Sequence, residues 1–183
     1  GGDMRIFAGF GAILKLDHWE SRFKTGNGGS QTRDNFQAGL AYRPESSDKI
    51  NALAKLAYVS ERNTHIAIPV RQDRYILSAH SYYQVDRRIG IGSRFATRFV
   101  LDEDAAFDEK VSTQTYFFQS RGEFAYSNKI SALLDARYIY MSPTSEGAFG
   151  LAVEGDYLVY KNVQFGVGYI LKNYSDADFA YLD

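Results

Sequence analysis

The residues with catalytic potential are few and scattered along the chain. It contains three histidines (His18, His65 and His80) and no cysteine, with 21 basic and 22 acidic side chains. A hydrolytic site needs a histidine near a serine or carboxylate, and only His18, beside Asp17, has a carboxylate next to it in the sequence. None of the histidines lies in a nucleophile motif, so we expect no enzymatic activity.

Metal, cofactor and nucleic-acid sites are not expected either. The stretch LDEDAAFDE offers Asp102, Asp104, Asp108 and Glu109 as oxygen ligands for Ca²⁺, but the glycine and spacing of an EF-hand are absent. We favour a solvated acidic loop. A net charge of -1 provides no basic stripe, so no nucleic-acid partner is indicated.

The charged side chains nevertheless follow a pattern, because many of them alternate with apolar residues. We expect the following set to share one face of a sheet and to form the charged lumen of a barrel: Lys15, Asp17, Arg43, Lys55, Arg74, Arg94, Arg98, Arg121, Glu123, Asp135, Arg137, Glu154 and Asp156. Unpaired charges in an interior are costly, so cross-strand pairing is expected.

The elements that would position these charges are β-strands, because apolar and polar residues alternate with period two through almost the whole chain. Nine runs show the pattern: 6–16, 36–42, 50–58, 75–85, 89–101, 116–126, 130–140, 149–159 and 163–171. Tight turns (RPESSDK, VDRR, YSNK and YKN) alternate with long polar loops at 20–34, 60–72 and 102–113. Residues 1–183 are thus predicted to form one all-β, up-and-down antiparallel domain.

Two barrels fit this alternation. In a soluble lipocalin-like barrel the apolar face points inward to a ligand, whereas in a transmembrane barrel it faces lipid. The positions of the glycines favour the transmembrane barrel, because glycine weakens a solvent-facing strand but makes room for large side chains in a crowded interior. The glycines on the polar face are Gly9, Gly11, Gly39, Gly90, Gly92, Gly150, Gly166 and Gly168.

Strand length and aromatic content agree with the membrane hypothesis. A tilted membrane strand needs about 9–11 residues, and the chain carries 14 tyrosines and 13 phenylalanines. We expect these tyrosines of the apolar face at the lipid interface: Tyr42, Tyr58, Tyr75, Tyr126, Tyr138, Tyr140, Tyr157 and Tyr169. No run of about 18 apolar residues could form a spanning helix, and GGDMRIF lacks the features of a signal peptide.

The turn lengths also predict which residues lie opposite one another. The expected pairs are Arg121 with Asp135, Gln119 with Arg137, Glu154 with Gly168, Asp156 with Gly166, and His80 with Arg94. For eight to ten strands the interior is just filled by side chains, so we favour a salt-bridged plug over an ion path.

In runs such as INALAKLAYVS and FGLAVEGDYLVY, the sequence resembles a bacterial outer-membrane β-barrel protein over nearly its whole length. The ending FGVGYILKNYSDADFAYLD is similar to the penultimate-strand segment of barrels at the C-termini of large modular surface proteins. In those proteins a further aromatic strand usually follows. The resemblance implies a Gram-negative outer membrane and about ten strands, the tenth incomplete after FAYLD or supplied by another segment or chain.

These observations together predict a non-enzymatic barrel whose partner is membrane lipid. It would anchor something at the cell surface, or present its long loops to a surface partner that the sequence does not identify. A narrow, porin-like diffusion pore is the alternative within the membrane class, and the soluble lipocalin-like barrel is the alternative outside it.

Overall fold

The computed structural model describes residues 2–7, 9–23, 29–45, 47–64, 70–104, 109–142, 144–161 and 163–173, and all regular structure in them is β-strand. The strands are β1 (Gly2–Phe7), β2 (Phe10–Phe23), β3 (Gly29–Tyr42), β4 (Ile50–Asn63), β5 (Val70–Gln84), β6 (Ile89–Asp104), β7 (Glu109–Ala125), β8 (Ile130–Ser142), β9 (Glu146–Tyr160) and β10 (Val163–Lys172). The described part has no helix with the length and hydropathy needed to cross a membrane.

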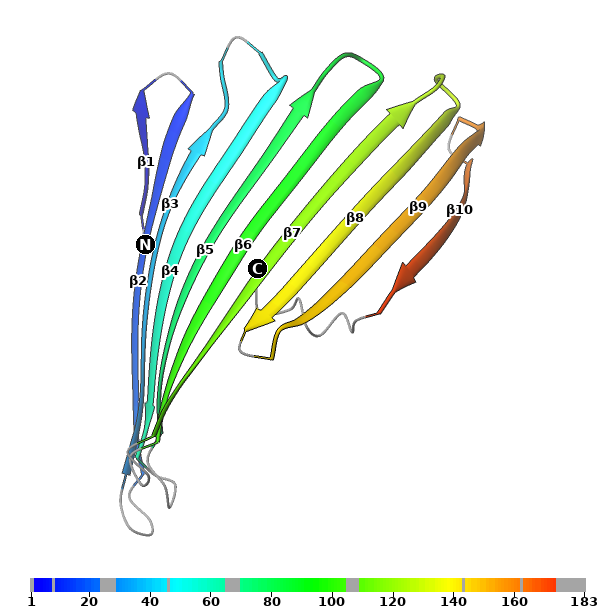
Figure 1. Ribbon diagram of the computed structural model, residues 1–183. Coiled ribbons are helices and arrows are strands. Elements are labelled where there is room, and N and C mark those ends of the chain that lie inside the picture. The colour runs from blue at the N-terminus through cyan, green and yellow to red at the C-terminus, as the bar shows by residue number, and fades with distance from the viewer. Residues whose placement is uncertain are drawn as a thin grey trace.

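The strands form one sheet in the order of the sequence, and every neighbouring pair is antiparallel. Figure 1 shows a strongly curved sheet, with the starts of β4, β6 and β8 at one end and the ends of β2, β4 and β6 at the other. The predicted all-β, up-and-down antiparallel meander is therefore confirmed. The sheet is not closed into a barrel, because β1 and β10 form its two edges and no pairing joins them in the described residues.

The first predicted strand, residues 6–16, is wrong in one respect. The chain reverses between Phe7 and Phe10, so that β1 pairs back onto β2. Gly9 makes this possible, since its φ is 80° and a Cβ there would lie 2.7 Å from the carbonyl oxygen of Arg43. The register shift between Arg5 and Phe7 restores the parity that a two-residue reversal changes, so that Met4 lies opposite Ala12. Alternation alone could therefore not reveal the turn. The sheet thus has nine strands of 10–17 residues, β2 to β10, and the six-residue β1.

The predicted extent of the three long polar loops is also wrong. Strands β2 to β7 extend deep into all three predicted loops, leaving only residues 24–28, 64–69 and 105–108 between consecutive strands. Polar contacts between neighbouring strands accompany this pairing: Arg33 Nε lies 3.3 Å from Glu61 Oε1, and Gln72 donates to Asp102 Oδ1 at 2.6 Å. These segments have no apolar alternation, so sequence reasoning missed the strands. We call the parts of β2 to β7 that lie within the predicted loops the polar strand ends: residues 20–23, 29–34, 60–63, 70–72, 102–104 and 109–113.

The tight turns are held by short side chains that replace missing strand partners. In the turn after β5, Asp86 Oδ1 accepts hydrogen bonds from the backbone N–H groups of Arg88 and Ile89 at 2.6 and 2.9 Å. In the turn after β7, Ser127 Oγ accepts from Lys129 and Ile130 at 3.2 and 3.1 Å. Such Asx- and Ser-turns fix the strand register at this end of the sheet.

The two faces of the sheet differ in burial. Ala96 is 0 % exposed, Ser78 2 % and Asp135 3 %. On the other face Leu40 is 56 % exposed and Phe118 52 %. Because side chains converge on the inside of a curved sheet, we call the face with Ala96 and Asp135 the concave face and the opposite one the convex face.

Candidate functional site

Twelve of the thirteen charged residues predicted for a lumen lie on the concave face. The strand register places Lys15 and Arg98 in one row across the sheet, Lys55 in the next row and Asp135 two rows further toward the tight turns. Arg43 is the exception. It follows β3 in a turn, where its Nη2 lies 2.7 Å from Asp48 Oδ1, and the prediction that it faces a lumen is wrong.

The register predicted from turn length is confirmed at every proposed pair. The pairs observed are Arg121 with Asp135, Gln119 with Arg137, Glu154 with Gly168, Asp156 with Gly166, and His80 with Arg94. Tight turns set strand register, and a one-residue slip would move every side chain to the other face.

The ion pairs described on the concave face run along strands as well as across them. Within single strands, Lys15 pairs with Asp17 at 2.8 Å, Arg121 with Glu123 at 3.0 Å, and Arg137 with Asp135 at 2.7 Å. Two cross-strand pairs join Glu61 to Arg74 at 2.6 Å and to Arg33 at 3.3 Å. Residues i and i+2 share a face, and the long basic side chains can bend back along it.

Asp135 is the most buried carboxylate described. Its Oδ1 accepts from Arg137 Nε at 2.7 Å, and its Oδ2 accepts from the Gln119 side-chain amide at 2.6 Å. Both oxygens therefore have donors, as a buried carboxylate requires.

A small apolar core lies among these charges, and sequence reasoning missed it. Ala96, Phe117 and Ile139 are adjacent in one row of the concave face, each at most 3 % exposed, with Ala148 packed against them. The guanidinium of Arg94 lies over the Phe117 ring, 5.2 Å from its centroid. The doublet Phe117–Phe118 was a signal, since one member of any adjacent pair must point inward.

A polar hollow of about 410 Å³ lies beside this core, on strands β4 to β7 toward the tight-turn end. Its concave-face lining consists of Asn51, Leu53, His80, Tyr82, Gly92, Arg94, Gln119 and Arg121. None of the residues that line it is an aspartate or glutamate. Gly92 faces Arg121 directly across the strands, and its missing side chain leaves the space open.

Glycines accommodate neighbouring side chains on the concave face, as predicted. A Cβ on Gly90 would collide with the hydroxyl end of Tyr82, and one on Gly166 would lie 2.7 Å from Asp156 Oδ1. The convex face uses the same device, because a Cβ on Gly147 would lie 2.9 Å from the Tyr138 hydroxyl. Gly9 departs from the prediction, as a turn residue.

The convex face carries the predicted tyrosines. In a row near the polar strand ends, the ring centroids of Tyr58 and Tyr75 are 4.9 Å apart and those of Tyr75 and Phe99 are 6.4 Å apart. At the tight-turn end, Phe10 and Tyr42 are 4.6 Å apart. Tyr138, Tyr140 and Tyr169 also lie toward the polar strand ends, and Tyr126 and Tyr157 toward the tight turns.

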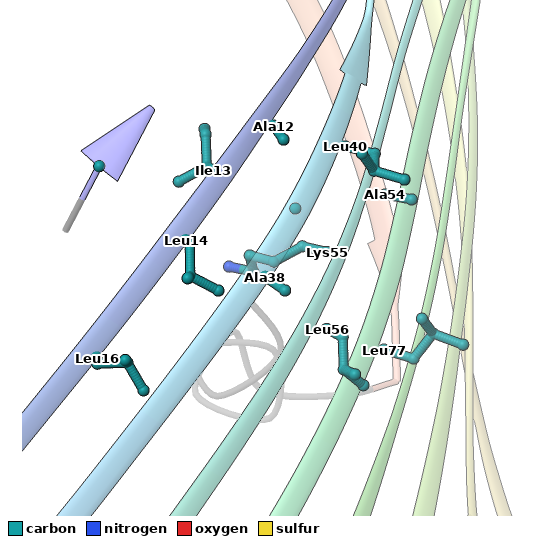
Figure 2. Close-up of a pocket in the computed structure, with 12 residues that line it drawn as sticks. Ala12, Ile13, Leu14, Leu16, Ala38, Leu40, Ala54, Lys55, Leu56 and Leu77 are labelled. Atoms are coloured by element: carbon teal, nitrogen blue, oxygen red, sulfur yellow. The ribbon is translucent and has the colours of Figure 1, made fainter. Parts of the chain in front are cut away.

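A shallow apolar hollow of about 690 Å³ lies between the aromatic rows, over β2 to β5. Figure 2 shows Leu14, Leu16, Leu40, Leu56 and Leu77 around the small residues Ala12, Ala38 and Ala54. The surface here is almost purely hydrocarbon.

Beyond the aromatic row, the convex side of the polar strand ends is charged. His18 and Asp34 lie directly opposite each other and form a hydrogen bond. This bond and the charge of Asp34 raise the pKa of the His18 imidazole above its ordinary value. At the end of β2, Arg22 lowers the pKa of Glu20 in the same way.

The described residues contain no group of three side chains suited to hold a metal ion. His65 and Asp108, considered above, lie outside the described residues. His18 is exposed and its described partner is Asp34, while His80 lines the polar hollow.

Comparison with known protein families, curated proteins and solved structures finds no match to this chain. The inference of function therefore rests on the geometry of the sheet and its two faces.

Proposed function

We propose that the chain is a transmembrane β-barrel domain of a bacterial outer membrane. It acts as a non-enzymatic anchor that presents its polar strand ends at the cell surface, with the tight turns on the periplasmic side. Its partner along the convex face is membrane lipid, and its concave face lines a largely filled lumen.

The observation that carries this proposal is the inverted burial of the two faces. Leucine, phenylalanine and tyrosine are exposed over the convex face of β2 to β9, while Ser78, Thr115 and Asp135 are buried on the concave face among apolar residues. Soluble monomers rarely expose contiguous apolar patches beyond a few hundred Å². A hydrocarbon solvent removes the cost of such a surface.

The height of the apolar band supports the same environment. On β7 and the turn that follows it, Tyr116 and Tyr126 bound the band and are ten residues apart. At about 3.3 Å per residue and a tilt of about 40°, this span is about 25 Å tall. Outer-membrane barrels have an apolar band of about this height between two aromatic girdles.

The open edges of β1 and β10 require a partner in a membrane. Unpaired backbone N–H and C=O groups are not tolerated in lipid, where only helices and closed barrels satisfy them. We propose that a further strand, from another segment or chain, pairs with these edges. Residues 179–183, which we predicted to begin such a strand, lie outside the described residues.

Extraction behaviour tests the membrane placement. We expect the folded protein to require detergent and to show heat-modifiable migration in gels, because its convex face aggregates in water. A chain that stays folded and monomeric in plain buffer would contradict the proposal and favour the lipocalin-like alternative.

A second measurement separates an anchor from a narrow pore. The ion pairs and the core around Phe117 fill much of the concave face, so we expect no stable open conductance in a planar bilayer. Steady, saturable conductance would replace the anchor function with that of a diffusion pore.

A further inference from the structure

We propose that the polar hollow between β4 and β7 is a binding site for a small phosphate ester. The inference deepens the proposed function and rests on it, because in a closed barrel the hollow would be an aqueous pocket at one end of an otherwise largely filled lumen. The volume of about 410 Å³ suits a small organic ligand.

The charge around the hollow favours an anion. On the concave face of β5 to β8, the rows from Arg98 to Glu123 contain four arginines, at 94, 98, 121 and 137, and two carboxylates, Glu123 and Asp135. Four positive and two negative charges leave a net charge of +2. The two carboxylates pair with Arg121 and Arg137, and neither lines the hollow.

The cationic donors are held in place before any ligand arrives. Arg94 rests on the buried Phe117 ring, and Arg121 is tied at its Nε to Glu123. The five N–H groups of an arginine form a fixed fork that matches phosphate oxygens. A donor that is fixed in advance loses less entropy on binding.

The lining of the hollow also includes a neutral polar group. Asn51 lines the hollow, and its Oδ1 is buried without a hydrogen-bond partner. A buried amide in this condition calls for an additional hydrogen-bonding group. A rotation of the Asn51 side chain would let a hydroxyl of an ester's organic part donate to Oδ1, which is why we infer a phosphate ester in place of bare phosphate.

Glycine 92 provides the space. A Cβ there would lie 3.8 Å from Arg121 Cβ and 3.8 Å from Tyr82 Cδ2, which are ordinary contacts. A larger side chain at this position can therefore be accommodated by the backbone and would fill the hollow. Gly92→Leu blocks the site without changing its charge.

Calorimetry on the full chain, folded in detergent micelles at low salt, tests the site with glucose 6-phosphate as the probe. We expect saturable binding of one equivalent and no binding of neutral glucose. Arg94→Gln and Arg121→Gln should each weaken binding at least tenfold, because each removes a charge-assisted hydrogen bond. Gly92→Leu should abolish it.

Matched variants separate a built site from general charge attraction. Lys15→Gln removes the same charge from the same face on β2, away from the hollow, and should change affinity less than twofold. Glu123→Gln removes a negative charge beside the hollow while its amide oxygen can still accept from Arg121 Nε, so it should tighten binding severalfold. Glu154→Gln, the same charge change on β9, should not. Circular dichroism checks that each variant is folded.

The proposal would be overturned by a folded wild-type chain that does not bind the probe, or by equal binding of glucose. It would also be overturned if Arg94→Gln, Arg121→Gln and Gly92→Leu bound the probe with the affinity of the wild type. Membrane placement fails or holds separately, in the extraction experiment. If the chain requires detergent but does not bind glucose 6-phosphate, only the binding site is refuted. If the chain is soluble in plain buffer and binds glucose 6-phosphate, only the membrane placement is refuted.

Discussion

At the scale of single residues, burial decides which charges stabilise the sheet. The side chain of Asp135 is 4 % exposed and has two donors, whereas that of Asp17 is 49 % exposed and pairs with Lys15. A buried ion pair that loses one partner leaves an uncompensated charge, while an exposed pair contributes little.

The Asp135→Ala variant should therefore lose roughly 3 kcal/mol of unfolding free energy, because Arg137 and Gln119 lose their acceptor. Asp17→Ala should lose less than about 1 kcal/mol. Urea unfolding of the chain in lipid vesicles measures both. Equal losses would show that Asp135 is not buried as described.

The His18–Asp34 pair predicts a pH effect outside the apolar band. Because the folded pKa of His18 is raised, the pair stabilises the fold fully below the ordinary histidine pKa of about 6.5. The stabilisation is lost as pH rises through the raised folded value. NMR titration of the His18 imidazole measures that value directly.

The Asp34→Asn variant should lower the pKa of His18 toward its ordinary value, since it removes both the charge and the carboxylate acceptor. A His18 pKa that does not change in Asp34→Asn would contradict the pairing.

Sequence reasoning predicted residue positions better than residue partners. Parity and turn length fixed the register, including Arg121 opposite Asp135. They could not predict which of two nearby carboxylates an arginine contacts, because that contact depends on the side-chain rotamers. Arg121 bonds Glu123 on its own strand instead.

At the scale of strands, alternation identified the apolar parts and failed where both faces are polar. The ends of β2 to β7 were predicted as loops, yet the chain remains paired through contacts such as Ser30 N–H to Thr64 Oγ1 at 2.9 Å. Once the apolar part sets the register, each further residue adds its hydrogen bonds without new loop closure.

Hydrogen exchange tests these strand ends. Amides of residues 29–34 and 58–63 should exchange orders of magnitude more slowly than those of an open loop, because they lie in β3 and β4. Mass spectrometry of peptides from these ranges measures the rates. Exchange as fast as in an unfolded peptide would restore the original loop prediction.

Gly90 of β6 offers another test. Gly90→Ala forces Tyr82 to move, and overpacking of this kind typically costs about 1–3 kcal/mol of unfolding free energy. Gly155→Ala is the matched control, since nothing lies within 4 Å of its added Cβ. Unfolding in urea should separate the two variants, and equal stability would mean that Tyr82 does not lie over Gly90.

At the scale of the whole molecule, the inverted faces make a prediction that no soluble sheet shares. Leu134 is exposed near the middle of the convex face of β8, and Ser112 lies beyond the apolar band on β7. In lipid, Leu134→Arg should cost roughly 2–4 kcal/mol and Ser112→Arg about 0–1 kcal/mol. Equal, small effects on the unfolding free energy would indicate that the convex face meets water.

The overall architecture was accessible from the sequence because the apolar pattern repeats in every strand. The short β1 was not, since the reversal at Gly9 leaves that pattern unbroken. The core around Phe117 and the polar hollow depend on curvature, which the parity of residues does not encode.

The orientation of the two faces is tested most directly by fluorescent labels on single cysteines, which the cysteine-free chain accepts without background. Labels at Phe118 and Phe124 lie on the convex face of β7, and labels at Gln119 and Arg121 lie on its concave face. In vesicles with brominated acyl chains, we predict strong quenching at positions 118 and 124 and little at 119 and 121. Stronger quenching at positions 119 and 121 than at 118 and 124, or equal quenching at all four positions, would contradict a lipid-facing convex surface.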